Sequence, residues 1–183
     1  MDFQGIVQRI EEKDPGVEPV TVEGGPGEPF LLVSEDSLSR TARLLKDDPE
    51  LLFDTLMCLS AVHEVGEPEQ LEVVYHLFSL AHRHRFTLKV QVDRPPILGH
   101  FYLRVPTVSD VWAAAGWMER EAFDLFGINF IGHRDLRRLL LPPDWLGHPL
   151  LKDYQEPGEY HGISTVRDMP APAEVSPQDR AGL

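Results

Sequence analysis

The sequence predicts an α+β protein: a two-layer fold in which a mixed sheet of about four to five strands is covered by helices, followed by an extended irregular C-terminal arm. Three observations predict it. Apolar residues recur at helical spacing near the N-terminus and again before residue 126. Apolar and polar residues alternate across residues 71–93, which is typical of strands. Residues 155–183 contain four prolines and no sustained apolar period.

The N-terminal elements follow from local pattern. Residues 3–13 place apolar side chains at helical spacing, and Asp14-Pro15-Gly16 ends that helix. Prolines and glycines between residues 15 and 29 leave only a weak strand over residues 18–23. Residues 30–33 form the first secure strand.

Two helices are expected next. Ser34 or Asp36 can cap one that continues through Leu45, and Asp48-Pro49-Glu50 has the form of a second helix start, which we extend to about residue 62. Cys58 lies in this apolar run, so we interpret it as a buried structural thiol. As the single cysteine it can form no internal disulfide and cannot hold an iron–sulfur cluster alone.

Strands are predicted over residues 71–80, 86–93 and 100–105, and three successive strands imply a meander. A helix over residues 109–126, with Gly116 as a candidate break, closes the domain. Gly127 stands where a helix needs a left-handed stop, and a short extended run follows before Gly132.

The predicted organisation is one domain with arms, since 183 residues at 42% hydrophobic content suit a single core. We divide the chain into an N-terminal helix and loop (1–29), an α+β core (30–131), an irregular docking segment (132–154) and an extended arm (155–183). A net charge of −13 argues against nucleic acid or an anionic membrane as the main ligand. The sequence shows neither a membrane-spanning apolar run nor a signal peptide, so we expect a soluble chain.

Residues 117–154 are the most informative stretch, because charged, aromatic and turn residues gather there without catalytic or metal-ligand spacing. Residues 119–138 hold four basic and four acidic side chains, a balance that suits pairing within the fold or with a partner. Glu119 and Glu121 lie two apart on a helix and point to different sides, which disfavours an acid–base pair. The pattern predicts a surface that fits another protein.

The motif Glu119-Arg120-Glu121, followed at fixed spacing by Asp124, His133 and Arg137, resembles the signature of the 30 kDa-type subunit of NADH-quinone oxidoreductase, respiratory complex I. The chain departs from the usual pattern at Arg134, Leu151 and Gln155. The resemblance assigns signature or partner-interface roles to Trp117, Glu119, Arg120, Glu121, Asp124, Phe126, Gly127, His133, Asp135, Arg137, Arg138, Pro142, Gly147, His148, Pro149, Lys152, Asp153 and Tyr154.

The resemblance implies a non-catalytic scaffold in the peripheral arm of a proton-translocating NADH:quinone oxidoreductase, peripheral to the cell membrane on its cytoplasmic side. Such a chain braces the large quinone-site subunit, which is of the 49 kDa type, and contacts neighbouring peripheral-arm subunits. It holds no catalytic, cofactor or metal residues of its own, because FMN and the iron–sulfur clusters belong to partner subunits.

Two alternatives remain. The same scaffold could serve a related membrane-bound hydrogenase or another donor:quinone dehydrogenase. A free-standing soluble enzyme with a histidine-based metal site would use His82-x-His84, or His133 and His148 if the irregular segment brings them together. Trp112, Trp117 and Trp145 are interpreted as core or interface residues.

Overall fold

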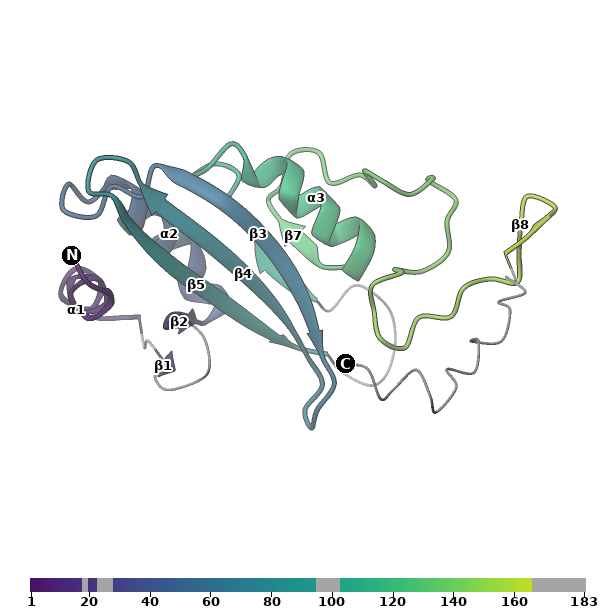
Figure 1. Ribbon diagram of the computed structural model, residues 1–183, viewed down its shortest axis with the longest axis horizontal. Helices are drawn as coiled ribbons and strands as arrows, with labels where there is room; N and C mark the ends of the chain where they lie inside the picture. Colours follow the sequence, from purple (N-terminus) through teal and green to yellow (C-terminus); the bar gives the residue numbers. More distant parts are fainter. Residues whose placement is uncertain (18–19, 23–27, 95–102, 166–183) are drawn as a thin grey trace, which may run out of the picture.

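The computed structural model describes residues 1–17, 20–22, 28–94 and 103–165 (Figure 1). Its centre is a five-stranded sheet in the order β1-β2-β5-β4-β3. The strands are β1 (Val20–Val22), β2 (Phe30–Val33), β3 (Thr55–Glu64), β4 (Gln70–Ser79) and β5 (His84–Asp93). Only the β2–β5 pairing is parallel, so the sheet is mixed, as predicted.

Two helices pack against this sheet: in Figure 1, α2 (Glu35–Asp47) lies behind it and α1 (Phe3–Lys13) lies at its left. Alternate residues of β4 and β5 point toward them, because successive side chains of a strand face opposite sides. Leu71, Tyr75 and Leu88 are fully buried on that face, and Ile10 and Leu45 of the helices are equally buried in the same core. The opposite face of the sheet is more polar.

A second unit adjoins the sheet beside β3. Strand β6 (Arg104–Pro106) pairs in parallel with β7 (Asn129–Ile131), and α3 (Ala115–Phe126) connects them. A parallel pair needs such a crossover. The buried Trp112 indole donates a hydrogen bond of 2.7 Å to the carbonyl of Phe53, which ties this unit to the sheet. No described helix combines the length and apolar character that crossing a bilayer requires.

Several predicted elements are confirmed: α1 and α2, the strands β2, β4 and β5, and the left-handed stop at Gly127, whose φ is 76°. The short extended run before Gly132 is β7. The tail adds a hairpin that the sequence did not indicate, formed by β8 (Glu159–Tyr160) and β9 (Ile163–Ser164).

The helix predicted to run from Asp48 to about residue 62 is wrong. Amides of Leu51 and Leu52 do bond to the Asp48 carbonyl, but Leu52 adopts a φ of 43°, which ends the turn after one step. The chain then becomes β3 and pairs with β4 along its length. Cys58 is consequently exposed, because a strand, unlike a buried helix, turns alternate residues outward.

Two further expectations need correction. The meander consists of β3, β4 and β5, whereas β6 leaves this sheet and pairs with β7; residues 100–102 of the predicted third strand lie outside the described residues. The last helix begins at Ala115 rather than at residue 109, because residues 107–114 form turns in which Val111 and Trp112 amides bond to the Val108 carbonyl.

Replacing Leu88 with Ala should lower the free energy of unfolding by about 2–5 kcal/mol, because the side chain is fully buried between β2 and β4 and its removal leaves a cavity. Urea denaturation measures this. Leu80→Ala is the matched control: its side chain is 65% exposed, so its effect should stay within about 0.5 kcal/mol. Equal losses in the two variants would contradict this account of the core.

Candidate docking site

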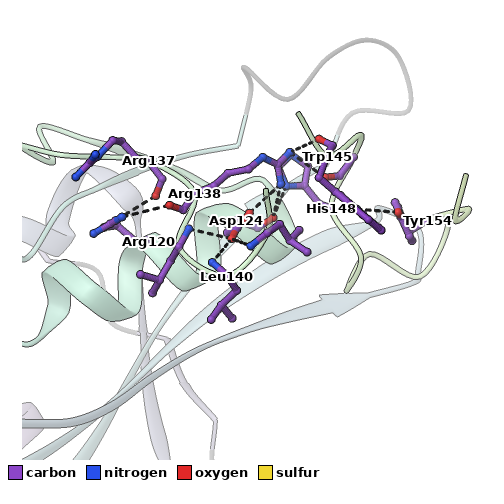
Figure 2. Close-up of polar contacts among 11 residues, drawn as sticks. Arg120, Asp124, Arg137, Arg138, Leu140, Trp145, His148 and Tyr154 are labelled. Atoms are coloured by element: carbon purple, nitrogen blue, oxygen red, sulfur yellow. Dashed lines mark hydrogen bonds and ion pairs between the residues drawn. The ribbon is translucent and has the colours of Figure 1, made fainter. Parts of the chain in front are cut away.

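The last turn of α3 holds a buried carboxylate that organises the segment after β7 (Figure 2). The side chain of Asp124 is 0% exposed. One oxygen accepts backbone amides of Leu139, Leu140 and Leu141 at 3.0, 2.7 and 2.9 Å, and the other accepts Arg138 Nη1 at 2.8 Å. Three consecutive amides therefore converge on one carboxylate oxygen.

Two opposing effects act on the pKa of Asp124. Burial by itself raises the pKa, but the amides of residues 139–141 and the Arg138 guanidinium together outweigh it, so the pKa lies below its ordinary value. A negative charge is otherwise unfavourable near a helix C-terminus. The carboxylate is thus stable only in combination with the segment that it binds.

Arg138 and His148 extend this network to the far side of the segment. Arg138 Nη2 donates to the carbonyls of Trp145 and Gly147, both at 3.1 Å. His148 Nδ1 donates to the backbone carbonyl of Asp124 at 2.8 Å, and the Leu150 amide donates to the carbonyl of Leu125. The terminal carbonyls of α3, which have no partner within a helix, are bonded by the same segment.

Two glycines permit this close approach. Gly127 and Gly147 both have left-handed backbones, with φ of 76° and 77°. A Cβ on Gly127 would lie 2.8 Å from the His148 ring, and one on Gly147 would lie 2.9 Å from the Tyr154 ring. Tyr154 in turn accepts the indole N–H of Trp145 at 3.0 Å.

The N-terminal half of α3 carries a second buried carboxylate, Glu119, which is 0% exposed. It accepts the Val108 amide at 2.8 Å and the Thr107 hydroxyl. Burial raises the pKa of Glu119 despite these bonds and the nearby His133. The His133 ring donates to the Gly116 carbonyl at 2.9 Å and accepts the Asp135 amide at 3.0 Å, so it fixes the start of the irregular segment.

Arginines complete the attachment along the helix. Arg120 donates to the carbonyls of Arg137 and Arg138 at 3.1 and 3.2 Å, and its guanidinium lies 5.0 Å from the centroid of Trp117. Arg137 instead forms an exposed pair with Asp135, at 2.6 Å. Arg138 therefore pairs with Asp124 inside the chain, whereas Arg137 pairs with Asp135.

The end of the segment is attached to the sheet through His63. The Lys152 amide donates to His63 Nδ1 at 2.9 Å, and His63 Nε2 lies 2.5 Å from Glu69. Arg94 bridges Glu69 and Asp153 at 2.6 and 2.9 Å. His63, Glu69 and Asp153 lie close enough to hold a metal ion together. The positive charge beside the two carboxylates is the guanidinium of Arg94, which pairs with both.

The segment over residues 138–150 and the adjoining helix α3 expose several large apolar side chains. Leu140 is 62% exposed, Leu146 73% and Leu150 49%, and Trp117 on α3 is 64% exposed. Backbone bonds hold Leu140 and Leu150 in place while their side chains stay in solvent. A fixed loop that exposes several large apolar side chains is a typical protein-binding surface.

The predicted site residues divide into two groups. Those that fasten the segment within the chain are Glu119, Arg120, Asp124, Gly127, His133, Arg138, Gly147, His148 and Tyr154. Half-buried or exposed residues that remain open to contact are Trp117, Glu121, Phe126, Asp135, Arg137, Pro142, Pro149, Lys152 and Asp153.

Sequence reasoning gave no site role to Leu140, Leu146 and Leu150, although apolar residues between turn residues could have indicated one. It also missed His63, Glu69 and Arg94, for which no local signal exists because their partners lie far away in the chain.

The histidines considered for a metal site bond to backbone carbonyls in the structure. His82 and His84 direct Nε2 at the carbonyls of Pro49 and Leu51, each at 2.9 Å. His133 and His148 bond to Gly116 and Asp124, which are eight residues apart on α3 and so about 12 Å apart along its axis. The irregular segment does not bring these two rings together.

Comparison with known proteins agrees with this architecture. The family model described as "Respiratory-chain NADH dehydrogenase, 30 Kd subunit" matches residues 31–160. A NADH-quinone oxidoreductase subunit of Roseiflexus castenholzii is 45% identical over 128 residues, covering 69% of this chain and 70% of the relative. The subunit of the same name from Chloroherpeton thalassium is 41% identical over 144 residues, covering 78% of this chain and 57% of the relative.

A solved structure is also similar. A chain of the membrane-bound sulfane sulfur reductase, described as an archaeal respiratory membrane complex, aligns with a TM-score of 0.66 and 27% identity, covering 83% of this chain and 85% of that one.

Fold and site together define an α+β protein that holds a long irregular segment against the end of one helix. The chain belongs to the 30 kDa subunit family of the respiratory-chain NADH dehydrogenase.

Asp124→Asn should destabilise the chain by about 3–5 kcal/mol, because it leaves the Arg138 guanidinium without its charged partner. Residues 138–150 should also become sensitive to protease. Urea denaturation and limited proteolysis measure the two effects. Glu121→Gln on the same helix is the control, since its side chain is exposed; a similar loss there would show that the effect is not specific to Asp124.

The contribution of Asp124 should depend on pH. Its pKa is lowered in the folded state, so the stabilisation is complete above the unfolded value of about 3.9 and is lost as the pH falls through the folded value. The difference in unfolding free energy between wild type and Asp124→Asn should therefore be constant above about pH 5 and shrink on acidification. A difference that grew at low pH would contradict the assignment.

Proposed function

We propose that this chain is a scaffold subunit of the peripheral arm of proton-translocating NADH:quinone oxidoreductase, respiratory complex I. In this proposal it lies on the cytoplasmic side of the cell membrane and braces the large quinone-site subunit of the 49 kDa type. Family membership supports the assignment to this complex. The observation that carries the scaffold role is the rigid apolar loop held by Asp124.

The docking surface consists of Leu140, Leu146, Leu150 and Trp117. Each is about half or more exposed, so covering them with a partner would remove a large apolar area from water. The loop is already ordered by bonds to α3, so its backbone loses little further freedom on binding. Preorganisation of this kind favours tight association.

In the assembled enzyme, electrons move from NADH through FMN and iron–sulfur clusters of partner subunits to quinone. The role of this chain is to hold the quinone-site subunit in place along that path. The buried titratable groups near α3 suit this role, because Glu119 and Asp124 each bind backbone amides of their own chain.

A second candidate is the equivalent subunit of a complex that oxidises another donor. The similarity to a chain of an archaeal sulfane sulfur reductase favours this alternative, because the same scaffold occurs in a complex named for a different reaction. Identities of 41–45% to NADH-quinone oxidoreductase subunits favour the NADH-linked complex.

The double variant Leu140→Asp and Leu146→Asp should fold normally yet be retained by its complex about tenfold less, because both side chains are exposed in the free chain and central to the proposed contact. The chain is tagged at its N-terminus and purified from gently solubilised membranes. Mass spectrometry then identifies and quantifies the partners, and NADH-dependent quinone reduction is assayed.

Leu80→Asp is the control for adding a carboxylate at an exposed leucine elsewhere, since Leu80 is 65% exposed at a distant turn. Recovery of the large quinone-site subunit with NADH-linked activity supports the proposal, and recovery of hydrogenase-type partners supports the second candidate. A wild-type chain that is recovered without partners would overturn both.

A further inference from the structure

We propose that the free edge of β3 is a second docking surface, which takes an extended, basic segment of a partner subunit as an additional strand. This inference rests on the proposed function, because the partner belongs to the same assembly. It concerns a different face of the chain from the loop held by Asp124. Figure 1 shows β3 at the margin of the sheet, beside α3.

The sheet order leaves one side of β3 unpaired. β4 pairs with one edge of β3 from Thr55 to Glu64, and among the described strands none pairs with the other. In an antiparallel pair, alternate residues direct their amide and carbonyl groups away from the partner strand. A strand of ten residues therefore presents a row of backbone groups that an extended peptide can satisfy.

This edge keeps only part of the usual protection. Sheet edges are blunted by short length, proline, charge, a β-bulge or a covering helix, and here α3 packs beside β3. The strand is nevertheless long and has no charged residue or proline from Thr55 to Val62. Met57 is 45% exposed and Val62 is 40% exposed. A bulge at Met57 shifts the register with β4, but the strand continues beyond it.

A groove next to the edge provides room for side chains of the added strand. It has a volume of about 210 Å³ and lies between β3 and α3. Its lining includes Leu59 and Ala61 of β3, Met118 and Phe126 of α3, and Leu150 of the docking segment. Leu150 thus belongs to both surfaces, so one partner can cover them without a gap.

Charge identifies the occupant. Asp54 and Glu64 are exposed at the two ends of β3, and the exposed Glu121 borders the groove. An apolar segment flanked by lysine or arginine complements this arrangement. A second copy of this chain does not, because antiparallel pairing of two β3 strands would bring Asp54 of one copy close to Glu64 of the other, and like charges destabilise cross-strand pairs.

Amide hydrogen exchange compares the isolated chain with the chain in its purified complex. Residues 55–64 should exchange about tenfold more slowly in the complex at the amides that face the free edge. Slower exchange there and over residues 138–150 supports both docking surfaces. Slower exchange over residues 138–150 alone overturns the β3 inference and leaves the proposed function standing.

Slower exchange at β3 alone supports the edge and contradicts docking through residues 138–150. If neither segment changes, both the proposed docking function and the β3 inference fail.

Charge reversal tests the chemistry of the occupant. The double variant Glu64→Lys and Glu121→Lys should be retained in the complex about tenfold less and should lose the slow exchange at β3, because it repels a basic segment. Glu11→Lys with Glu12→Lys, exposed on α1, is the matched control for the same change in net charge. Equal retention of both double variants, with unchanged thermal stability, would overturn the basic character of the occupant.

Discussion

The carboxylate of Asp124 is the interaction on which the structure of residues 138–150 depends. It binds three consecutive amides and the Arg138 guanidinium, and Arg138 then fixes the carbonyls of Trp145 and Gly147 (Figure 2). A segment with almost no regular secondary structure thus gains a defined backbone. Without this buried charge, the peptide groups of residues 139–141 would lack their acceptor, and the apolar side chains beside them would have no fixed positions.

The rest of the fold positions α3 so that Asp124 can bind this segment. The sheet buries one face against α1 and α2, and the parallel β6–β7 pair holds the two ends of the α3 crossover. Two buried carboxylates of α3 then bind the flanking loops: Glu119 binds the loop after β6, and Asp124 binds the segment after β7. Several charged residues of the signature, among them Glu119, Asp124 and Arg138, therefore form contacts within the chain. The proposed docking surface of Leu140, Leu146, Leu150 and Trp117 is apolar.

The elements predicted correctly are those whose signals are local. Helices α1 and α2 combine a strong apolar period with clear boundaries, and β4 and β5 alternate so regularly that only one face can enter the core. Strand β3 was missed because its apolar and small residues fit a buried helix equally well. Pairing with β4 decided between the two, and that interaction is invisible until the partner strand is in place.

By itself, the sequence determined the α+β class, the stop at Gly127 and the family signature of residues 119–154, since these depend on residue type and spacing alone. Only the tertiary structure decided which way the signature faces. A charged side chain on a helix can enter solvent, a partner or its own chain, and the outcome depends on what lies opposite it. Asp124 meets amides fifteen or more residues away, and His63 meets one 89 residues away. Such distances along the chain close only when the whole fold has formed.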